Sequence, residues 1–219
     1  MKDGLSKAFA THIVINQSNP KQWWQLAKPI RDELVKDGLS KSDATQIVIG
    51  HSNPRQWWQL AKPIRDELVK DDLSKAFATQ IVIKQSNPKQ WWQQAKPIRD
   101  ELVKDGLSKS DATQIVIKQS NPKQWWQQAK PIRDELVKDG LSKTFATQIV
   151  INQSNPKEWW QQAKPIRDEL VKDGLSKTFA TQIVIGWANP KQWWQEAKPI
   201  RDELVKDGLS KAFATQIVI

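Results

Sequence analysis

The apolar residues of this chain follow two helical patterns that recur together along the sequence. Between residues 39 and 72, the longer pattern places apolar residues at i, i+4, i+7 and i+11, namely Trp57, Ala61, Ile64 and Leu68. A shorter pattern precedes it, with apolar residues at Ala44, Ile47 and Val48. Stripes with this spacing are typical of amphipathic helices. The pattern therefore predicts a short first helix that ends near Ile49 and a longer second helix.

Polar residues mark where the two predicted helices begin. Ser40, with Asp43 three residues later, is a preferred N-cap for the first helix. Asn53 followed by Pro54 marks the start of the second helix, because proline is favoured in the first turn, where its missing N–H is not needed. Each repeat thus carries its own start signals for both helices.

Proline and glycine mark the interior and the end of the second helix. Pro63 removes an amide donor inside the helix, which predicts either a kink near Lys62 or a break into two short helices. Asp72 takes the place of a helix-ending glycine once, at some cost in the left-handed conformation. The glycines that end the other repeats are Gly38, Gly106, Gly140, Gly174 and Gly208.

These helices belong to a 34-residue unit that recurs six times. The repeats span residues 5–38, 39–72, 73–106, 107–140, 141–174 and 175–208, and a partial repeat covers 209–219. A unit of this size does not bury its own apolar face, so its stability must come from stacking on its neighbours. We therefore predict one all-α array over residues 1–219, a solenoid or superhelix of helical hairpins.

The repeats differ mainly at one pair of adjacent residues in the predicted loop between the two helices. The pairs are Asn16-Gln17, Gly50-His51, Lys84-Gln85, Lys118-Gln119, Asn152-Gln153 and Gly186-Trp187. Each follows the block Ile-Val-Ile and precedes a nearly constant Ser-Asn-Pro-Lys-Gln-Trp-Trp. A constant framework with one variable window per module indicates a protein that recognises a periodic partner.

Charge favours a polyanionic partner. The chain has 34 Lys and Arg against 24 Asp and Glu, a net charge of +10 that is spread over the repeats. Such a balance suits nucleic acid and also suits simple solubility, and the periodicity favours nucleic acid. There is no cysteine, no apolar run near 18 residues and no signal-peptide pattern at the amino terminus. We expect a soluble protein without a membrane segment, and its compartment is unknown.

No pattern in the sequence predicts catalysis or a cofactor. There is no Ser-His-Asp set, metal-ligand cluster or glycine-rich phosphate loop. The run Arg31-Asp32-Glu33 recurs in every repeat, which we interpret as a charged helix face. Tryptophan pairs such as Trp23-Trp24 favour packing between repeats over base stacking. We expect no enzyme, no cofactor, no metal site and no small-molecule substrate.

The succession of a short helix, a variable pair, a polar turn, Lys-Gln and a long proline-containing helix that ends in glycine resembles the repeats of transcription activator-like effectors, whose period matches. Arrays of that family wrap double-stranded DNA, and each repeat contacts one base with the second residue of its pair while the first braces the loop. The resemblance implies base-contacting residues at Gln17, His51, Gln85, Gln119, Gln153 and Trp187. It implies loop-bracing residues at Asn16, Gly50, Lys84, Lys118, Asn152 and Gly186. This chain has Ser-Asn after the pair where the family has Gly-Gly.

The chemistry of these residues supports the same partner. Gln pairs with adenine and His donates to guanine in the major groove, whereas Trp offers only apolar contact. The first turn of the second helix favours phosphate through its free amides and dipole. The residues predicted to bind phosphate there are Lys21, Arg55, Lys89, Lys123, Lys157 and Lys191, with Gln22, Gln56, Gln90, Gln124 and Gln192.

The leading hypothesis is therefore sequence-specific binding of double-stranded DNA, one base per repeat, by a monomer. One alternative is a peptide-binding scaffold like the tetratricopeptide group, which also has 34-residue hairpins. Another is an array that binds single-stranded RNA.

Overall fold

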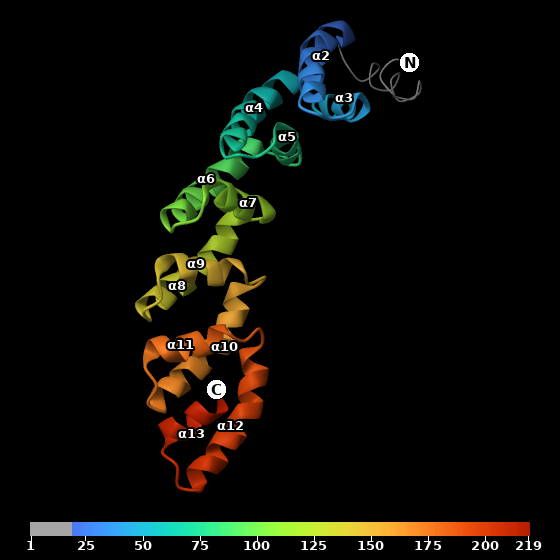
Figure 1. The fold of residues 1–219 in the computed structure, drawn as a ribbon. Helices are drawn as coiled ribbons and strands as arrows, with labels where there is room; N and C mark the ends of the chain where they lie inside the picture. The colour runs from blue at the N-terminus through green and yellow to red at the C-terminus, as the bar shows by residue number, and fades with distance from the viewer. Residues whose placement is uncertain (1–18) are drawn as a thin grey trace. The chain divides into compact units, whose positions relative to one another are not determined.

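A computed structural model describes residues 19–219, which form helices and loops without any strand (Figure 1). The variable residues Asn16 and Gln17 lie outside the described residues. The second helices are α2 (Pro20–Lys36), α4 (Pro54–Lys70), α6 (Pro88–Lys104), α8 (Pro122–Lys138), α10 (Pro156–Lys172) and α12 (Pro190–Lys206). The first helices are α3 (Lys41–Ile49), α5 (Lys75–Ile83), α7 (Lys109–Lys118), α9 (Lys143–Ile151), α11 (Lys177–Ile185) and α13 (Lys211–Val218).

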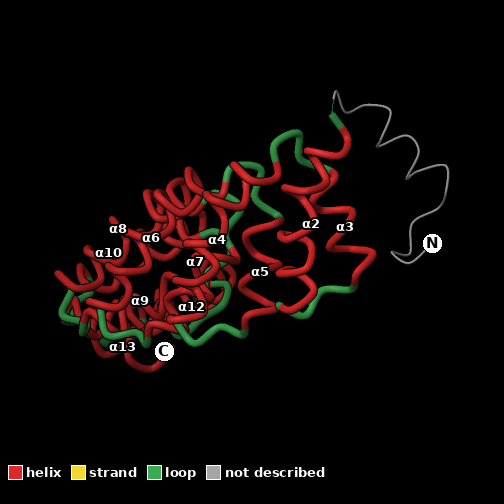
Figure 2. The backbone as a smooth tube through the Cα atoms, turned by 90° about the horizontal axis from the view of Figure 1, so that it is seen from above, coloured by secondary structure: helices red, strands yellow, loops and turns green. Residues whose placement is uncertain are grey.

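The chain divides into two compact units. Unit 1 comprises Met1–Asp100 and Ser108–Lys118, and unit 2 comprises Glu101–Leu107 and Gln119–Ile219. In unit 1 the second helix α2 packs against α4, and in unit 2 α10 packs against both α8 and α12. Figure 2 shows the helices joined by short loops. Repeated hairpins that contact their neighbours confirm the predicted all-α solenoid class.

Each second helix begins at an Asn-Pro pair, as predicted. In α4 the Asn53 side chain caps the helix by accepting the backbone N–H of Gln56 at 3.0 Å, and Pro54 occupies the first turn. Pro63 lies inside α4, yet the helix continues as one element to Lys70. The break into two helices, one of the two predicted outcomes, therefore does not occur, because neighbouring turns hold the helix together around the missing donor.

A tight turn joins each second helix to the first helix of the next repeat. The N–H of Leu39 donates to the carbonyl of Leu34 at 3.1 Å, and the N–H of Gly38 donates to that of Val35 at 3.0 Å. These are the two bonds of a Schellman motif, which places its glycine in the left-handed region. Gly38 has φ +105° and Asp72, at the equivalent position, has φ +66°. Helices α2 and α3 thus pack together across the repeat boundary.

The predicted apolar stripe of the second helix forms the core. In α4 the buried members of the stripe are Trp57, Ala61, Ile64 and Leu68. Phe77, by contrast, stays 45% exposed near the start of α5. In α3 the equivalent residue is Asp43, which accepts the hydroxyl of the capping Ser40 at 2.7 Å. This position therefore holds either an aspartate that accepts a hydrogen bond from the N-cap serine or an exposed phenylalanine, and neither residue changes the core.

Candidate nucleic-acid interface

From the second repeat to the sixth, the variable pair connects the end of a first helix to the cap of a second helix, and backbone hydrogen bonds hold it. Gly50 has φ −69° and ψ −10°, and Asn152 has φ −79° and ψ −10°, so both extend the helical backbone. The N–H of Gly50 donates to the carbonyl of Gln46 at 3.1 Å, and that of His51 donates to Val48 at 3.4 Å. Glycine can occupy the first place of the pair because the main chain makes these contacts.

The other first residues of the pairs occupy the same place. Lys84 and Gly186 follow the last residue of their helices as C-caps, and Lys118 is the last residue of α7. The bracing role of these residues stays a prediction, because the contacts that fix these loops come from the backbone, and Gly186 has no side chain to contribute.

The second residue of two pairs stacks on the first tryptophan of the following helix. The rings of His51 and Trp57 have centroids 4.2 Å apart at an interplanar angle of 14°. Those of Trp187 and Trp193 are 5.2 Å apart at 10°. Burial lowers the pKa of His51 below its ordinary value of 6.5, so this ring is mainly neutral at pH 7 and offers one donor and one acceptor. The side chains of Gln85, Gln119 and Gln153 are half-buried.

An exposed cation follows each pair at the second residue of the second helix. These residues are Lys21, Arg55, Lys89, Lys123, Lys157 and Lys191. Within residues 19–219, none of the six forms an ion pair. The neighbouring glutamine is already engaged in capping, since Gln56 donates its N–H to Asn53 and its side-chain oxygen accepts from Asn53 at 3.4 Å. The cations are therefore better placed than the glutamines to contact phosphate.

A buried carboxylate joins three consecutive repeats. Asp105, which is 2% exposed, accepts from Arg133 of the next repeat and from the Thr147 hydroxyl, 3.0 Å away, of the repeat after that. Lys143 lies 2.8 Å from its other oxygen. The aspartates that make the same pair of contacts are Asp37, Asp71, Asp105, Asp139 and Asp173.

Glu101 forms a second junction between repeats. It accepts from the indole N–H of Trp126 at 3.0 Å and from Arg133 at 2.7 Å, and it pairs with Lys130. The guanidinium of Arg133 lies 5.3 Å from the centroid of the Trp126 ring, within range of a cation–π contact. Burial alone raises the pKa of Glu101, but the hydrogen bonds from Lys130, Arg133 and Trp126 outweigh it and lower the pKa to about 2.

These junctions correct one interpretation from the sequence and extend another. The Arg-Asp-Glu run is not simply a charged helix face, because its arginine is buried; Arg133 is 0% exposed. The tryptophans do pack between repeats, and from the second repeat to the sixth the second of each pair also donates a hydrogen bond to the preceding repeat, as Trp126 does to Glu101. The recurring Asp before each glycine was the available sequence signal, because a constant acid at a helix end suggests a constant partner.

The ion pairs locate the excess positive charge of the repeat. In the fourth repeat, Lys109, Lys130 and Arg133 are matched by carboxylates. In the fourth repeat, the lysines of α8 left without an ion pair in the described chain are Lys123, at the start of the helix, and Lys138, at its end. Among the described residues, an unpaired cation thus follows the variable pair, joined in the third and fourth repeats by the lysine of the pair itself, and another lies at the far end of the same helix.

A pocket beside the variable pair occurs in each unit. In unit 1 a pocket of about 270 Å³ is lined by His51, Trp57 and Leu60 of one repeat and by Ser86 and Asn87 of the next. In unit 2 a pocket of about 290 Å³ is lined by the equivalent residues Gln119, Trp125, Gln128, Ser154 and Asn155. Each pocket is therefore built by two successive repeats, with the second residue of the pair in its wall.

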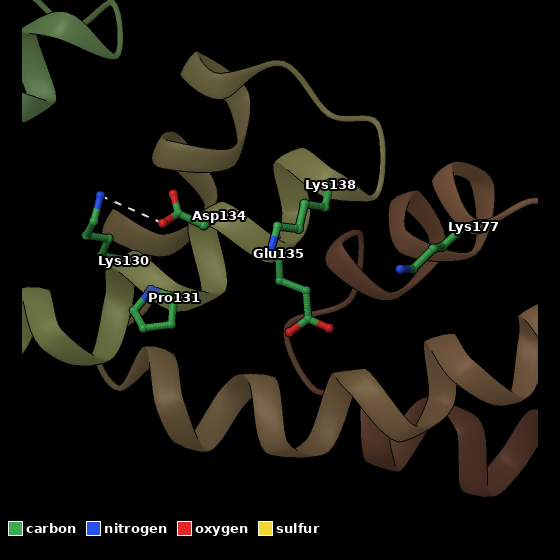
Figure 3. A pocket seen from close by; sticks show the side chains of 6 residues that line it. All are labelled: Lys130, Pro131, Asp134, Glu135, Lys138 and Lys177. Carbon is green, nitrogen blue, oxygen red and sulfur yellow. Dashed lines mark ion pairs between the residues drawn. The ribbon is translucent and has the colours of Figure 1, made fainter.

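Larger pockets lie near the opposite end of the second helix. One in unit 2, of about 560 Å³, is lined by lysines and carboxylates from α8 together with Lys177 (Figure 3). Lys130 pairs there with Asp134 at 3.7 Å, and Lys177 pairs with Asp139 at 2.8 Å. Carboxylates pair with Lys130 and Lys177 and also line this pocket, and only Lys138 in its wall has no ion pair within the described part of the chain. This pocket is therefore a weaker candidate for an anion than the surface beside the variable pairs.

Comparison of the chain with protein-family models, curated proteins and solved structures finds no match. From residue 19 onward, none of the helices combines the length and apolar character needed to cross a bilayer. In the same part of the chain, no group of three or more His, Asp or Glu side chains is arranged to hold a metal ion. The assignment of the candidate interface therefore rests on the geometry of the repeats alone.

Proposed function

We propose that this chain binds double-stranded DNA, with one base contacted per repeat by the variable pair and a phosphate contacted by the cation that follows it. The observation that carries the proposal is the recurrence of these two features at the same end of each second helix. In the second repeat, His51 lies in the loop and Arg55 in the first turn of α4, exposed and without an ion pair in the described chain. Each base of a duplex is attached to the sugar-phosphate backbone, so one helix end can contact a base edge and a nearby phosphate together.

The rigidity of the loop supports the proposal physically. Backbone hydrogen bonds from Gly50 and His51 to α3, together with the stacking of His51 on Trp57, fix the loop before any partner binds. A preorganised contact residue loses little conformational entropy on binding. A neutral histidine can donate to the N7 or O6 acceptors of guanine, and the glutamines can pair with adenine.

Selection from randomised duplexes tests base recognition. We expect an enriched motif whose positions follow the order of the repeats. Binding should also weaken with salt, at a log–log slope of about −5 if about six phosphates are neutralised. No enriched motif, together with weak binding that is insensitive to salt, would refute the proposal.

Paired charge variants locate the phosphate contacts. Lys123→Gln should reduce the salt slope by about 1 without changing the preferred motif, because a phosphate contact carries no sequence information. Lys138→Gln is the matched control, since it also removes an exposed lysine without an ion pair in the described chain, from the other end of α8. Equal effects of both substitutions would show that net charge, and not the placement of Lys123, determines binding.

A second candidate function is binding of single-stranded RNA, which one observation favours. Trp187 is 42% exposed and stacks on Trp193, so its outer face is open to an unpaired base. Stacking on aromatic side chains is a common mode of single-strand recognition. Competition between duplex DNA and single-stranded RNA separates the two functions, and loss of RNA binding in Trp187→Ala would favour the second. A peptide-binding scaffold is less favoured, because the variation falls in a loop and little of it on a helix face.

A further inference from the structure

A second variable position lies on the second helix, three residues after the first tryptophan. From the first repeat to the sixth it is occupied by Leu26, Leu60, Gln94, Gln128, Gln162 and Glu196. The residue before it is glutamine and the residue after it is alanine in all six repeats. The position thus changes from apolar to amide to acid between constant neighbours.

The core does not determine which residue occupies this position. Leu60 is 38% exposed, and Glu196 is exposed as well, whereas the following Ala61 is fully buried. An exposed leucine gains little from folding, and a position that packing controlled would not accept glutamate. The changes therefore need a cause outside the framework of the repeat.

The structure places this side chain in the same pocket as the second residue of the variable pair. Leu60 and His51 share the pocket of unit 1, and Gln128 and Gln119 share the pocket of unit 2. In both pockets the first tryptophan of the helix lies in the wall with them. Each volume, about 270 Å³ and about 290 Å³, lies just below the range of sites that enclose a small ligand, which suits the edge of one base and not a whole molecule.

We propose that this position is a second specificity determinant, which contacts the same base as the variable pair of its own repeat. The inference rests on the proposed binding of double-stranded DNA. Leu60 beside His51 supplies an apolar surface that fits the methyl group of thymine, whose O4 can accept a hydrogen bond from His51 in place of a guanine acceptor. Gln128 beside Gln119 supplies a second amide, which can donate to or accept from a purine edge. Base preference is therefore a property of three residues per repeat.

Transplanting the residues of one repeat into another tests the inference in the full chain. The third and fourth repeats carry the same combination, Lys84-Gln85 with Gln94 and Lys118-Gln119 with Gln128, so they should select the same base. The variant G50K/H51Q gives the second repeat their pair but keeps Leu60. Adding Leu60→Gln completes the transplant.

We expect the triple variant G50K/H51Q/L60Q to select the base of the fourth repeat at the position of the second repeat. The double variant should prefer that base at least about fivefold less than the triple variant does. A factor of about five is the lower end of the discrimination that one good hydrogen-bonded contact provides. Gln59→Leu is the matched control, because it changes an exposed neighbour that does not line the pocket, and it should leave the selected motif unchanged.

The outcomes separate this inference from the proposed function. If the original chain selects a motif and the double variant already reproduces the preference of the fourth repeat, the inference is wrong and DNA recognition by the pair stands. If Gln59→Leu shifts the motif as much as Leu60→Gln does, base preference responds to any change on this exposed helix surface, and the inference is again wrong. If the original chain selects no motif, the proposed function fails and the inference fails with it.

Discussion

Replacing Trp160 by phenylalanine is expected to destabilise unit 2 more than the same change at its neighbour Trp159. Both side chains are buried, 6% and 7% exposed, and their ring centroids lie 5.4 Å apart, so each substitution removes the same group from the same core. They differ in the indole nitrogen. That of Trp160 donates to Glu135 at 3.0 Å, whereas that of Trp159 is buried without a partner. The comparison therefore tests the polar contacts of Trp160, chief among them the hydrogen bond between repeats.

The expected difference is at least about 2 kcal/mol. A hydrogen bond to a charged acceptor contributes about 1.5–3 kcal/mol, and Trp160→Phe loses it. This substitution also weakens the cation–π contact with Arg167, whose guanidinium lies 5.2 Å from the Trp160 ring centroid. Trp159→Phe loses the same ring volume, but it removes an unsatisfied buried donor, which offsets part of the loss by about 1 kcal/mol or more.

Hydrogen exchange of the backbone amides of α10 is the suitable assay. Repeat arrays can open one part at a time, so a single unfolding transition of the whole chain does not define the local free energy. We expect lower protection in α10 for Trp160→Phe than for Trp159→Phe, at similar helix content by circular dichroism. Equal protection in the two variants, or lower protection in Trp159→Phe, would refute the stabilising role assigned to the Trp160–Glu135 bond.

Three further predictions concern the framework. Four glutamates have a pKa of about 2, below the ordinary 4.5: Glu33, Glu101, Glu135 and Glu169. Because the unfolded chain binds more protons between these two pKa values, the stability that these glutamates contribute is complete above about pH 4.5 and is lost as the pH falls toward about 2. Urea midpoints that stay constant over that range would contradict this. Asp105→Asn removes one of the carboxylates that pair with the buried Arg133 and leaves Glu101 and Asp134 in place, so it should lower stability by about 3 kcal/mol, the lower end for a broken buried pair, against less than about 1 kcal/mol for the half-exposed Asp134→Asn; similar thermal melts would disprove the distinction. Asp72→Gly relieves a left-handed aspartate at φ +66° and should raise the melting temperature, by a stabilisation of up to about 1 kcal/mol.

The helices could be predicted from the sequence because their signals are local. Ser40 and Asn53 cap helices within three residues of themselves, and the apolar spacing of the second helix gives its buried face directly. The partners of Asp105 could not be predicted, because Arg133 and Thr147 lie 28 and 42 residues away. Those contacts depend on the register in which successive repeats stack, and a single repeat contains no information about that register.

The candidate site was predictable only in part, for a similar reason. The sequence locates the variable pair and the cation after it, since both are local features of one repeat. It does not show that His51 stacks on Trp57 or that Leu60 shares a pocket with His51, because both depend on the path of the loop between the helices. The sequence shows the substitutions at the second variable position, but only the pocket connects this position to the variable pair.

The buried network also explains why variation between repeats is confined to so few positions. Each aspartate such as Asp105 connects its own repeat to the two that follow, so one change in the framework disturbs three repeats at once. A substitution is tolerated only where a side chain takes no part in these contacts, as at the exposed Phe77 or Leu60. The framework uses its charged side chains to hold repeats together, which leaves the loop, its pocket and the adjacent unpaired cation free to differ or to meet a partner. Under the proposed function, variation at those positions follows from what the partner presents and not from what the fold requires.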